Sequence, residues 1–160
     1  MNEAPTPAQL ARNNKDNQDA IARQDGIRPL VQLLESGDDE AEVLSCAACA
    51  VMELTRNNVV NQHAIVDVGG ISQLANLIKN NRHMRVMSEV AGALWALAED
   101  AEIKIAIATA ATISPLVGLL GSEDARATAH AASALASLGL ENKSNQVQIT
   151  QMLIELLSSG

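Results

Sequence analysis

Two cysteines three residues apart, Cys46 and Cys49, form the pattern in this chain that comes nearest to a reactive or metal-binding site. A Cys-x-x-Cys pair supports redox chemistry when it follows a strand, and it binds zinc when two further ligands are available. Here the pair lies inside an alanine-rich segment with helical spacing, and the chain has no other cysteine. The pattern therefore favours small packing residues over a redox or zinc site.

Other groupings that support catalysis are also missing from the sequence. The three histidines, His63, His83 and His130, lie in separate segments at unmatched positions. We find no Ser-His-Asp or Cys-His arrangement, no glycine-rich phosphate loop and no carboxylate pair with a plausible partner. We therefore expect a protein that is not an enzyme and that needs neither a cofactor nor a metal ion.

The segments that carry these residues recur along the chain. The residues at 17–21 and 26–34 reappear with the same spacing at 61–65 and 70–78. A shorter match follows at 107–120, and a compressed one at 145–157. Between them lie alanine-rich segments whose apolar residues are spaced by four, four and three, as on one face of a helix. These apolar residues are Val43, Ala47, Val51 and Leu54, then Val86, Val90, Leu94 and Leu97, then Ala127, Ala131, Leu135 and Leu138.

A helical period of about 41 to 44 residues predicts an all-α fold, a solenoid of stacked three-helix units. In the first unit we expect a short helix around Ile21, a second helix over 29–34 and a third over 40–54. Gly26 and Gly70 are expected to close helices in the left-handed conformation. Further corners are expected at Gly37 and Gly121, and the pair at 114–115 should supply an N-cap and a proline at the first helical position.

These residues resemble the armadillo repeat over about residues 10–157, most clearly at 69–71 (Gly-Gly-Ile) and 91–97 (Ala-Gly-Ala-Leu-Trp-Ala-Leu). The resemblance implies a right-handed α-solenoid, and it is closest to the armadillo domains of vacuolar adaptors and plant ubiquitin ligases. Three features depart from the family pattern. Thr112 replaces a corner glycine, the last unit is about one turn short, and the asparagine of the family's third helix is missing.

The repeat pattern divides the chain into five parts. We expect an N-terminal segment that is disordered or foreign to the repeats at 1–9, and the end of a preceding helix plus the first repeat at 10–58. The second repeat is expected at 59–100, the third at 101–141, and a partial fourth at 142–160. The outer repeats carry no polar caps, such as repeat arrays require. Self-association through the uncapped ends is therefore a further expectation.

Composition limits the classes of partner. The formal net charge is −8, which opposes binding to a phosphate backbone. No apolar run reaches the ~18 residues of a membrane-spanning helix, so we expect no membrane insertion and a cytoplasmic protein, with the nucleus also open. An acidic chain favours basic protein segments through electrostatic steering. The alternative is that these charges only keep the surface soluble.

In armadillo proteins the third helices line a concave surface, and the resemblance places two rows of residues there. The row that holds tryptophan in peptide-binding relatives is Cys49, Gly92 and Ser133 here, and the row that holds asparagine is Glu53, Ala96 and Ser137. The resemblance therefore implies the fold but not the family's grip on nuclear-localisation signals. We expect a groove in which Gly92 and Ser133 leave room, with an acidic bias from Glu53, Glu89, Glu99, Asp100 and Glu141.

The sequence thus predicts a scaffold or adaptor that binds a protein or peptide partner, and its acidic charge favours a basic one. The expected binding residues are Cys49, Glu53, Ser88, Gly92, Trp95, Ala96, Glu99, Ser133 and Ser137. Trp95, the only aromatic residue, is either a binding anchor or a filler between repeats. The alternatives to an adaptor are the substrate-recruiting array of a ubiquitin ligase and a self-associating structural or tethering module.

Overall fold

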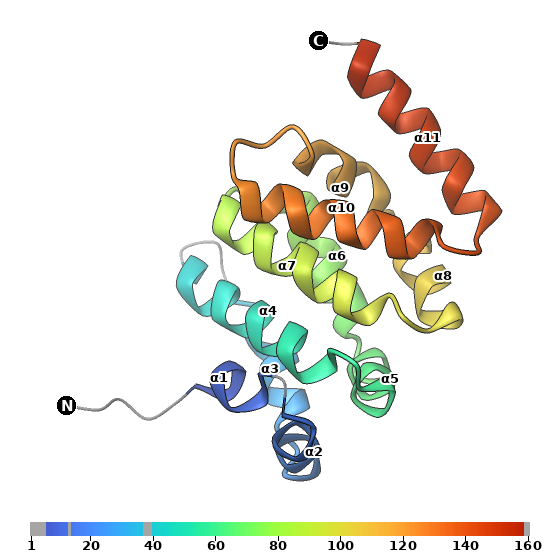
Figure 1. Ribbon diagram of the computed structural model, residues 1–160. Helices are drawn as coiled ribbons and strands as arrows, with labels where there is room; N and C mark the ends of the chain where they lie inside the picture. Colours follow the sequence, from blue (N-terminus) through green and yellow to red (C-terminus); the bar gives the residue numbers. More distant parts are fainter. Residues whose placement is uncertain (1–5, 13, 37–39, 159–160) are drawn as a thin grey trace.

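The computed structural model describes residues 6–12, 14–36 and 40–158, and within these ranges it contains eleven α-helices and no strand (Figure 1). Gly37 lies outside the described residues. The helices are α1 (Pro7–Ala11), α2 (Lys15–Arg23), α3 (Ile27–Leu33), α4 (Ala41–Thr55), α5 (Val59–Asp67), α6 (Gly70–Asn80), α7 (Met84–Leu97), α8 (Ala101–Thr109), α9 (Ile113–Leu119), α10 (Ala125–Gly139) and α11 (Lys143–Ser158).

The helices form three stacked units of three, which confirms the predicted α-solenoid. The third helices α4, α7 and α10 lie side by side, with α7 packed between the other two, and α3, α6 and α9 lie behind them (Figure 1). The short α1 packs beside α4. The last helix, α11, is continuous over 16 residues. The turn that is missing from the sequence after Ile149 is therefore the corner that separates the first and second helices in the other units.

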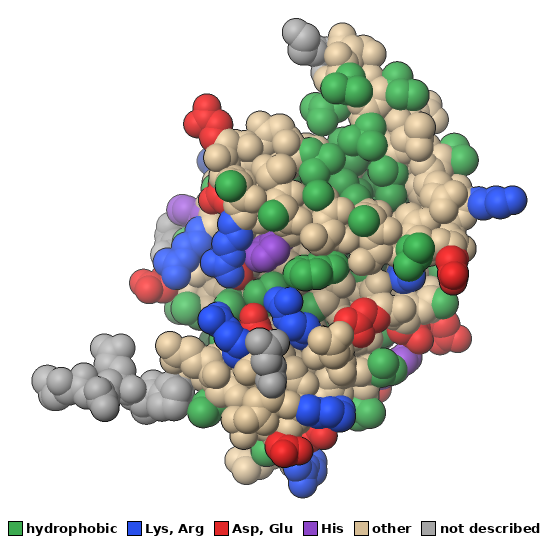
Figure 2. Space-filling model, viewed as in Figure 1, with side chains coloured by type: hydrophobic (Ala, Val, Ile, Leu, Met, Phe, Trp, Pro, Cys, Tyr) green, Lys and Arg blue, Asp and Glu red, His purple; other side chains and the backbone are tan. Residues whose placement is uncertain are grey.

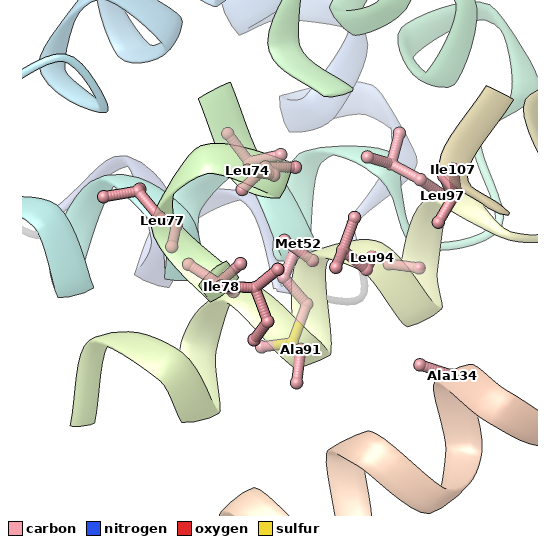
Figure 3. Close-up of a cluster of buried hydrophobic side chains, with 14 of the residues drawn as sticks. Met52, Leu74, Leu77, Ile78, Ala91, Leu94, Leu97, Ile107 and Ala134 are labelled. Atoms are coloured by element: carbon pink, nitrogen blue, oxygen red, sulfur yellow. The ribbon is translucent and has the colours of Figure 1, made fainter. Parts of the chain in front are cut away.

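The core runs through all three units and consists of aliphatic and alanine side chains. Figure 3 shows how Leu74 and Ile78 of α6 meet Leu94 of α7, with Met52 reaching in from α4. These four side chains are at most 2% exposed. The core therefore joins neighbouring units as well as the helices of one unit, as expected when a repeat cannot bury its apolar face alone.

Side-chain amides tie α1, α4 and α10 to the helix that follows each of them. Asn17 donates to Leu10 O (2.8 Å), Asn61 to Leu54 O (3.0 Å) and Asn145 to Leu138 O (2.9 Å). The same bond, spanning seven residues, thus occurs three times. It satisfies carbonyl groups that the end of a helix leaves without an intrahelical partner.

Gln18 and Gln62 add a second set of links, each within its own unit. Gln18 Nε2 donates to the carbonyl of Glu53 at 2.7 Å, and Gln62 Nε2 donates to the carbonyl of Ala96 at 3.0 Å. Both glutamines are fully or nearly fully buried. Each therefore ties its first helix to the third helix of its own unit.

The prediction that Gly26 and Gly70 close helices in the left-handed conformation is wrong. The left-handed residues stand one position earlier, at Asp25 (φ 57°), Gly69 (φ 82°) and, in the third unit, Ala111 (φ 60°). Gly26 has φ −71° and needs its missing side chain for another reason. A Cβ there would lie 2.7 Å from Ile21 Cγ2 and 2.8 Å from its carbonyl oxygen. The glycine therefore serves close packing.

Thr112 occupies the place of this glycine in the third unit. It is fully buried, and its Oγ1 donates to the carbonyl of Ile107 at 2.9 Å. In the first unit the backbone N–H of Gly26 donates to the equivalent carbonyl of Ile21 at 3.0 Å. The threonine thus keeps the corner by replacing a backbone hydrogen bond with a side-chain one.

The predicted start of the third unit's second helix is also wrong. Thr112 is the N-cap residue and α9 begins at Ile113, so Ser114 lies inside the helix and Pro115 is its third residue. Proline is tolerated there because the first four N–H groups of a helix have no intrahelical acceptor. The corner itself therefore stays where the repeat spacing predicts it.

No single helix among the described residues is both long and apolar enough to cross a membrane. By length and composition alone, α8 and α9 reach that level only when taken together, and the two helices are bent by 84° at their junction.

Ala111→Gly should stabilise the protein. Ala111 holds a left-handed conformation that costs a residue with a Cβ about 1 kcal/mol, and its side chain is exposed. We expect the free energy of unfolding to rise by about 0.5 kcal/mol, because glycine's greater chain entropy offsets part of the gain. Urea denaturation followed by circular dichroism measures this difference.

Gly69→Ala is the matched control, because no atom lies within 4 Å of a Cβ added there. A loss of stability there therefore reports backbone strain less the gain from the lower chain entropy of alanine, without any steric clash, and we expect about 0.5 kcal/mol. A lower stability of Ala111→Gly would contradict the assignment of strain to this corner.

Candidate functional site

The surface of α4, α7 and α10 that faces away from α3, α6 and α9 is named the third-helix face here. Figure 2 shows this face, with arginine and lysine side chains gathered near its middle and hydrophobic side chains gathered between α10 and α11. In repeat proteins the curvature of the array makes such a face a concave binding surface. We therefore place each predicted site residue relative to it.

Trp95 lies on the middle helix of this face, near the C-terminal end of α7. Its side chain is partly buried and packs against the main core cluster. The guanidinium carbon of Arg56 lies 5.1 Å from its ring centroid, within the range of a cation–π interaction. The ring of His130 lies 6.3 Å away, tilted by 34°. One aromatic ring thus contacts side chains from the third helices of two neighbouring units.

Gly92 does not leave open room on the face, contrary to the prediction. It is buried, and a Cβ built on it would lie 2.5 Å from Met52 Sδ and 2.9 Å from His130 Nδ1. His130 is held over it by a 2.8 Å hydrogen bond between Nδ1 and the carbonyl of Ser88. The glycine is needed because side chains of both neighbouring units already occupy the space.

The other small residues divide into a buried and an accessible group. Ser88 and Ala96 are only 2% and 4% exposed and cannot contact a partner directly. Ser133 and Ser137 are partly exposed, and Ser133 Oγ donates to the carbonyl of Ala129 within its own helix. Of this group, the two serines on α10 are thus open to a ligand.

Two of the five carboxylates behind the predicted acidic bias are buried in ion pairs. Glu89 has a side chain 5% exposed and accepts from both terminal nitrogens of Arg126, at 2.8 and 3.1 Å. Glu53, 6% exposed, lies 3.5 Å from Arg56 Nη2 and 4.0 Å from Arg12 Nε. A buried carboxylate requires such a partner. These two residues therefore present no free negative charge.

The remaining acidic residues serve the helix junctions. Glu99 is exposed and accepts from Gln62 Nε2 at 2.8 Å and from the backbone N–H of Asn57 at 3.3 Å. Asp100 caps α8 by accepting from two of its first N–H groups. Glu141 lies in the left-handed turn before α11. Among these three, Glu99 and Glu141 are exposed.

Sequence reasoning missed His130, Arg56, Arg126 and Met52, which shape the face. Each contacts a residue 35 to 42 positions away along the chain, such as Arg126 with Glu89. A signal was present in the repeat itself. His130 stands at the position of Glu89 and of Cys46 in the earlier units. These three residues form a row one helical turn before Ser133, Gly92 and Cys49, and the repeat spacing predicts that this row also lies on the face.

The two cysteines are free thiols with different surroundings. Cys46 is exposed, whereas Cys49 is partly buried. Burial, and after it the charges of Glu89 and Glu53, raises the pKa of the Cys49 thiol. Within the described ranges no three His, Cys, Asp or Glu side chains converge on a point where a metal ion could bind.

Comparison with known proteins places this geometry in a fold family. No family model matches the chain, and no curated protein matches it. Two engineered proteins of known crystal structure are each 31% identical to it, with a TM-score of 0.83. The matches cover 95% and 91% of this chain and 37% and 58% of theirs, so the chain spans less than two thirds of either engineered protein.

Two designed armadillo repeat proteins also match. One, in complex with the peptide (KR)4, is 24% identical with a TM-score of 0.78, covering 93% of this chain and 60% of its own. The other is 22% identical with a TM-score of 0.83, covering 96% and 66%. The fold is therefore a right-handed α-solenoid of stacked armadillo-type repeats.

The two cysteines should differ in reactivity toward a thiol reagent such as DTNB. Only the thiolate reacts, and burial raises the pKa of the Cys49 thiol. At pH 8 we expect one fast and one slow labelling phase, with the slow phase gaining more in rate as the pH is raised to 9.5. Stopped-flow absorbance measures both phases.

Cys46→Ser should remove the fast phase and Cys49→Ser the slow one. Equal rates for the two single variants at pH 8 would contradict the difference in burial and charge around the two thiols.

Proposed function

We propose that this chain is a protein-interaction scaffold that holds a partner segment in extended form along the third-helix face, with Trp95 as its anchor. The single observation that carries the proposal is the partly exposed Trp95 ring between Arg56 and His130. Tryptophan and arginine are the residue types that most often dominate binding energy at interfaces. The armadillo-type fold supports a peptide ligand, since one related design is described as made for modular peptide recognition.

The contacts around Trp95 suggest how an extended segment would bind. Side chains of the segment would pack on the ring and on the partly exposed Cys49, while Ser133, Ser137 and Glu99 offer polar groups. Three helices spaced by about 10 Å span roughly 30 Å, enough for about nine extended residues. The sequence-based preference for a basic segment stays a prediction, because Glu53 and Glu89 already pair with arginines.

The ubiquitin-ligase array remains an alternative proposal, and its support is the likeness of residues 69–71 and 91–97 to such armadillo domains. A self-associating module is favoured by a structural observation. Val147, Ile154 and Leu157 on α11 are 66%, 60% and 82% exposed. Apolar side chains that gather on a surface mark contact sites.

Binding of extended peptides is the first test, using basic, acidic and apolar pools at low and moderate salt. Because Trp95 is the only aromatic residue, its fluorescence reports contact directly. We expect a saturable emission change with one pool, and Ser133→Leu, which fills the accessible part of the face, should weaken binding at least about tenfold. Ser144→Leu, on exposed α11, is the control. Absence of binding in all pools would overturn the proposal.

Self-association is tested by sedimentation velocity over a wide concentration range. We expect oligomers that grow with concentration, and Ile154→Lys should abolish them because a charge at an apolar interface is costly. Val60→Lys changes a side chain that is 75% exposed on α5 and should have no effect. A strictly monomeric mass at high concentration would exclude the self-associating module.

A further inference from the structure

A cavity of about 470 Å³ lies at the first-unit end of the third-helix face, between α1, α3 and α4. Its walls include Leu30 and Leu33 of α3 and Val43 and Ala47 of α4, and α1 closes one end. Trp95 does not line this cavity, although Cys49, which lies beside the site proposed for an extended segment, does. Its lining is mostly apolar. The equivalent side chains in the second and third units show what such a lining normally packs against.

The same wall is covered in the second and third units. Leu33 is 42% exposed, but its equivalents Leu77 and Leu119 are only 6% and 3% exposed. Val43 is partly exposed, whereas its equivalent Val86 is fully buried. The units differ in the third helix that precedes them. The second unit is preceded by α4, which has 15 residues, and the third by α7, which has 14. The first unit is preceded by α1, which has only five.

The short α1 packs only against the C-terminal half of α4. Its Ala8 and Ala11 form a cluster with Ala50 and Leu54. The N-terminal half of α4 and the neighbouring Leu33 therefore face the cavity. This groove has the lining that elsewhere in the molecule receives two or three turns of a third helix, so the ligand that fits it is an α-helix.

The charges at the rim indicate the chemistry of that helix. Arg12, Arg85 and Arg126 line the cavity with Glu42 and Glu89, which leaves one net positive charge in a chain of net charge −8. Arg126 is paired with Glu89 at 2.8 Å, and Arg12 lies 4.0 Å from a carboxylate. Arg85 is exposed, and within the described ranges no ion pair of its side chain is recorded.

We propose that this groove binds an amphipathic α-helix of a partner protein, with apolar residues at i, i+3, i+4 and i+7 on Leu33 and Val43 and with carboxylates facing Arg12 and Arg85. Insertion of an apolar helix face into a groove is a common mode of recognition. Carboxylates of the ligand match Arg85, for which no ion pair is seen in the described ranges, and Arg12, which lies 4.0 Å from the Glu53 carboxylate. The anchor residues and the ligand conformation differ from those of the extended segment on Trp95, and the two sites adjoin at Cys49.

The test uses a fluorescein-labelled peptide of about 12 residues, held helical by a lactam bridge because short free helices are marginal in water. It carries leucines at the four anchor positions and glutamates beside them. Fluorescence anisotropy with the full chain should give saturable binding that weakens with salt. A version with two prolines in place of the bridge, of otherwise equal composition, should bind at least about tenfold more weakly, because it cannot form the helix.

Two substitutions of groove residues test whether the peptide binds there. Leu33→Ser and Arg85→Glu should each weaken binding at least about fivefold, since they remove an anchor contact and an attractive charge. Val60→Ser, at a side chain 75% exposed on α5, and Arg28→Glu, exposed on α3, both lie outside the cavity; they are the matched controls and should change it less than about twofold. Circular dichroism melts of all four variants verify that the fold is kept.

Three results would overturn the proposal. The first is a Kd above about 1 mM for the bridged peptide. The second is equal binding of the proline version, which would assign the groove to extended segments. The third is an oligomer of the unliganded chain that Leu33→Ser dissociates, which would show that a second copy fills the groove. Failure of the extended pools on Trp95 affects none of these readings, so the two proposals are tested separately.

Discussion

The side-chain amides at the junctions after α1, α4 and α10 fix how each of these helices leads into the next one. A helix that ends leaves carbonyl groups without partners, and burying them unpaired costs about 1–3 kcal/mol each. Asn17, Asn61 and Asn145 satisfy one such carbonyl in the same way, each from the first turn of the following helix. The direction of that helix is thereby fixed, and with it the position of the next third helix and of the face that all three form.

The third unit shows that this device can be replaced. Its N-cap is Asp100, and the position of Asn61 is taken by Ile103, which is 2% exposed in the core. The carbonyl of Ala96 is instead reached by Gln62. A hydrophobic contact and a hydrogen bond from the preceding first helix thus do the work that the asparagine does in the other units.

Helix order, the three-helix period and the approximate helix bounds could be predicted from the sequence, because these follow from local apolar spacing that repeats. The third helix expected over 40–54 is α4 at 41–55. Details at the corners could not. Gly26 is a glycine because Ile21 presses against it, and that contact exists only once the corner has formed. Left-handed Ala111 carries no sequence signal, since alanine ordinarily avoids that conformation.

The chemistry of the third-helix face was harder to predict for a physical reason. A motif read along one helix assigns a property to each position, but on this face the property depends on side chains from the neighbouring units. Glu89 is acidic in the sequence and neutralised by Arg126 in the fold. Gly92 is small in the sequence and covered by Met52 and His130. Units that have diverged in sequence can therefore keep one fold while the face changes, because each exchange of residues across a unit boundary alters the surface without altering the helices beneath it.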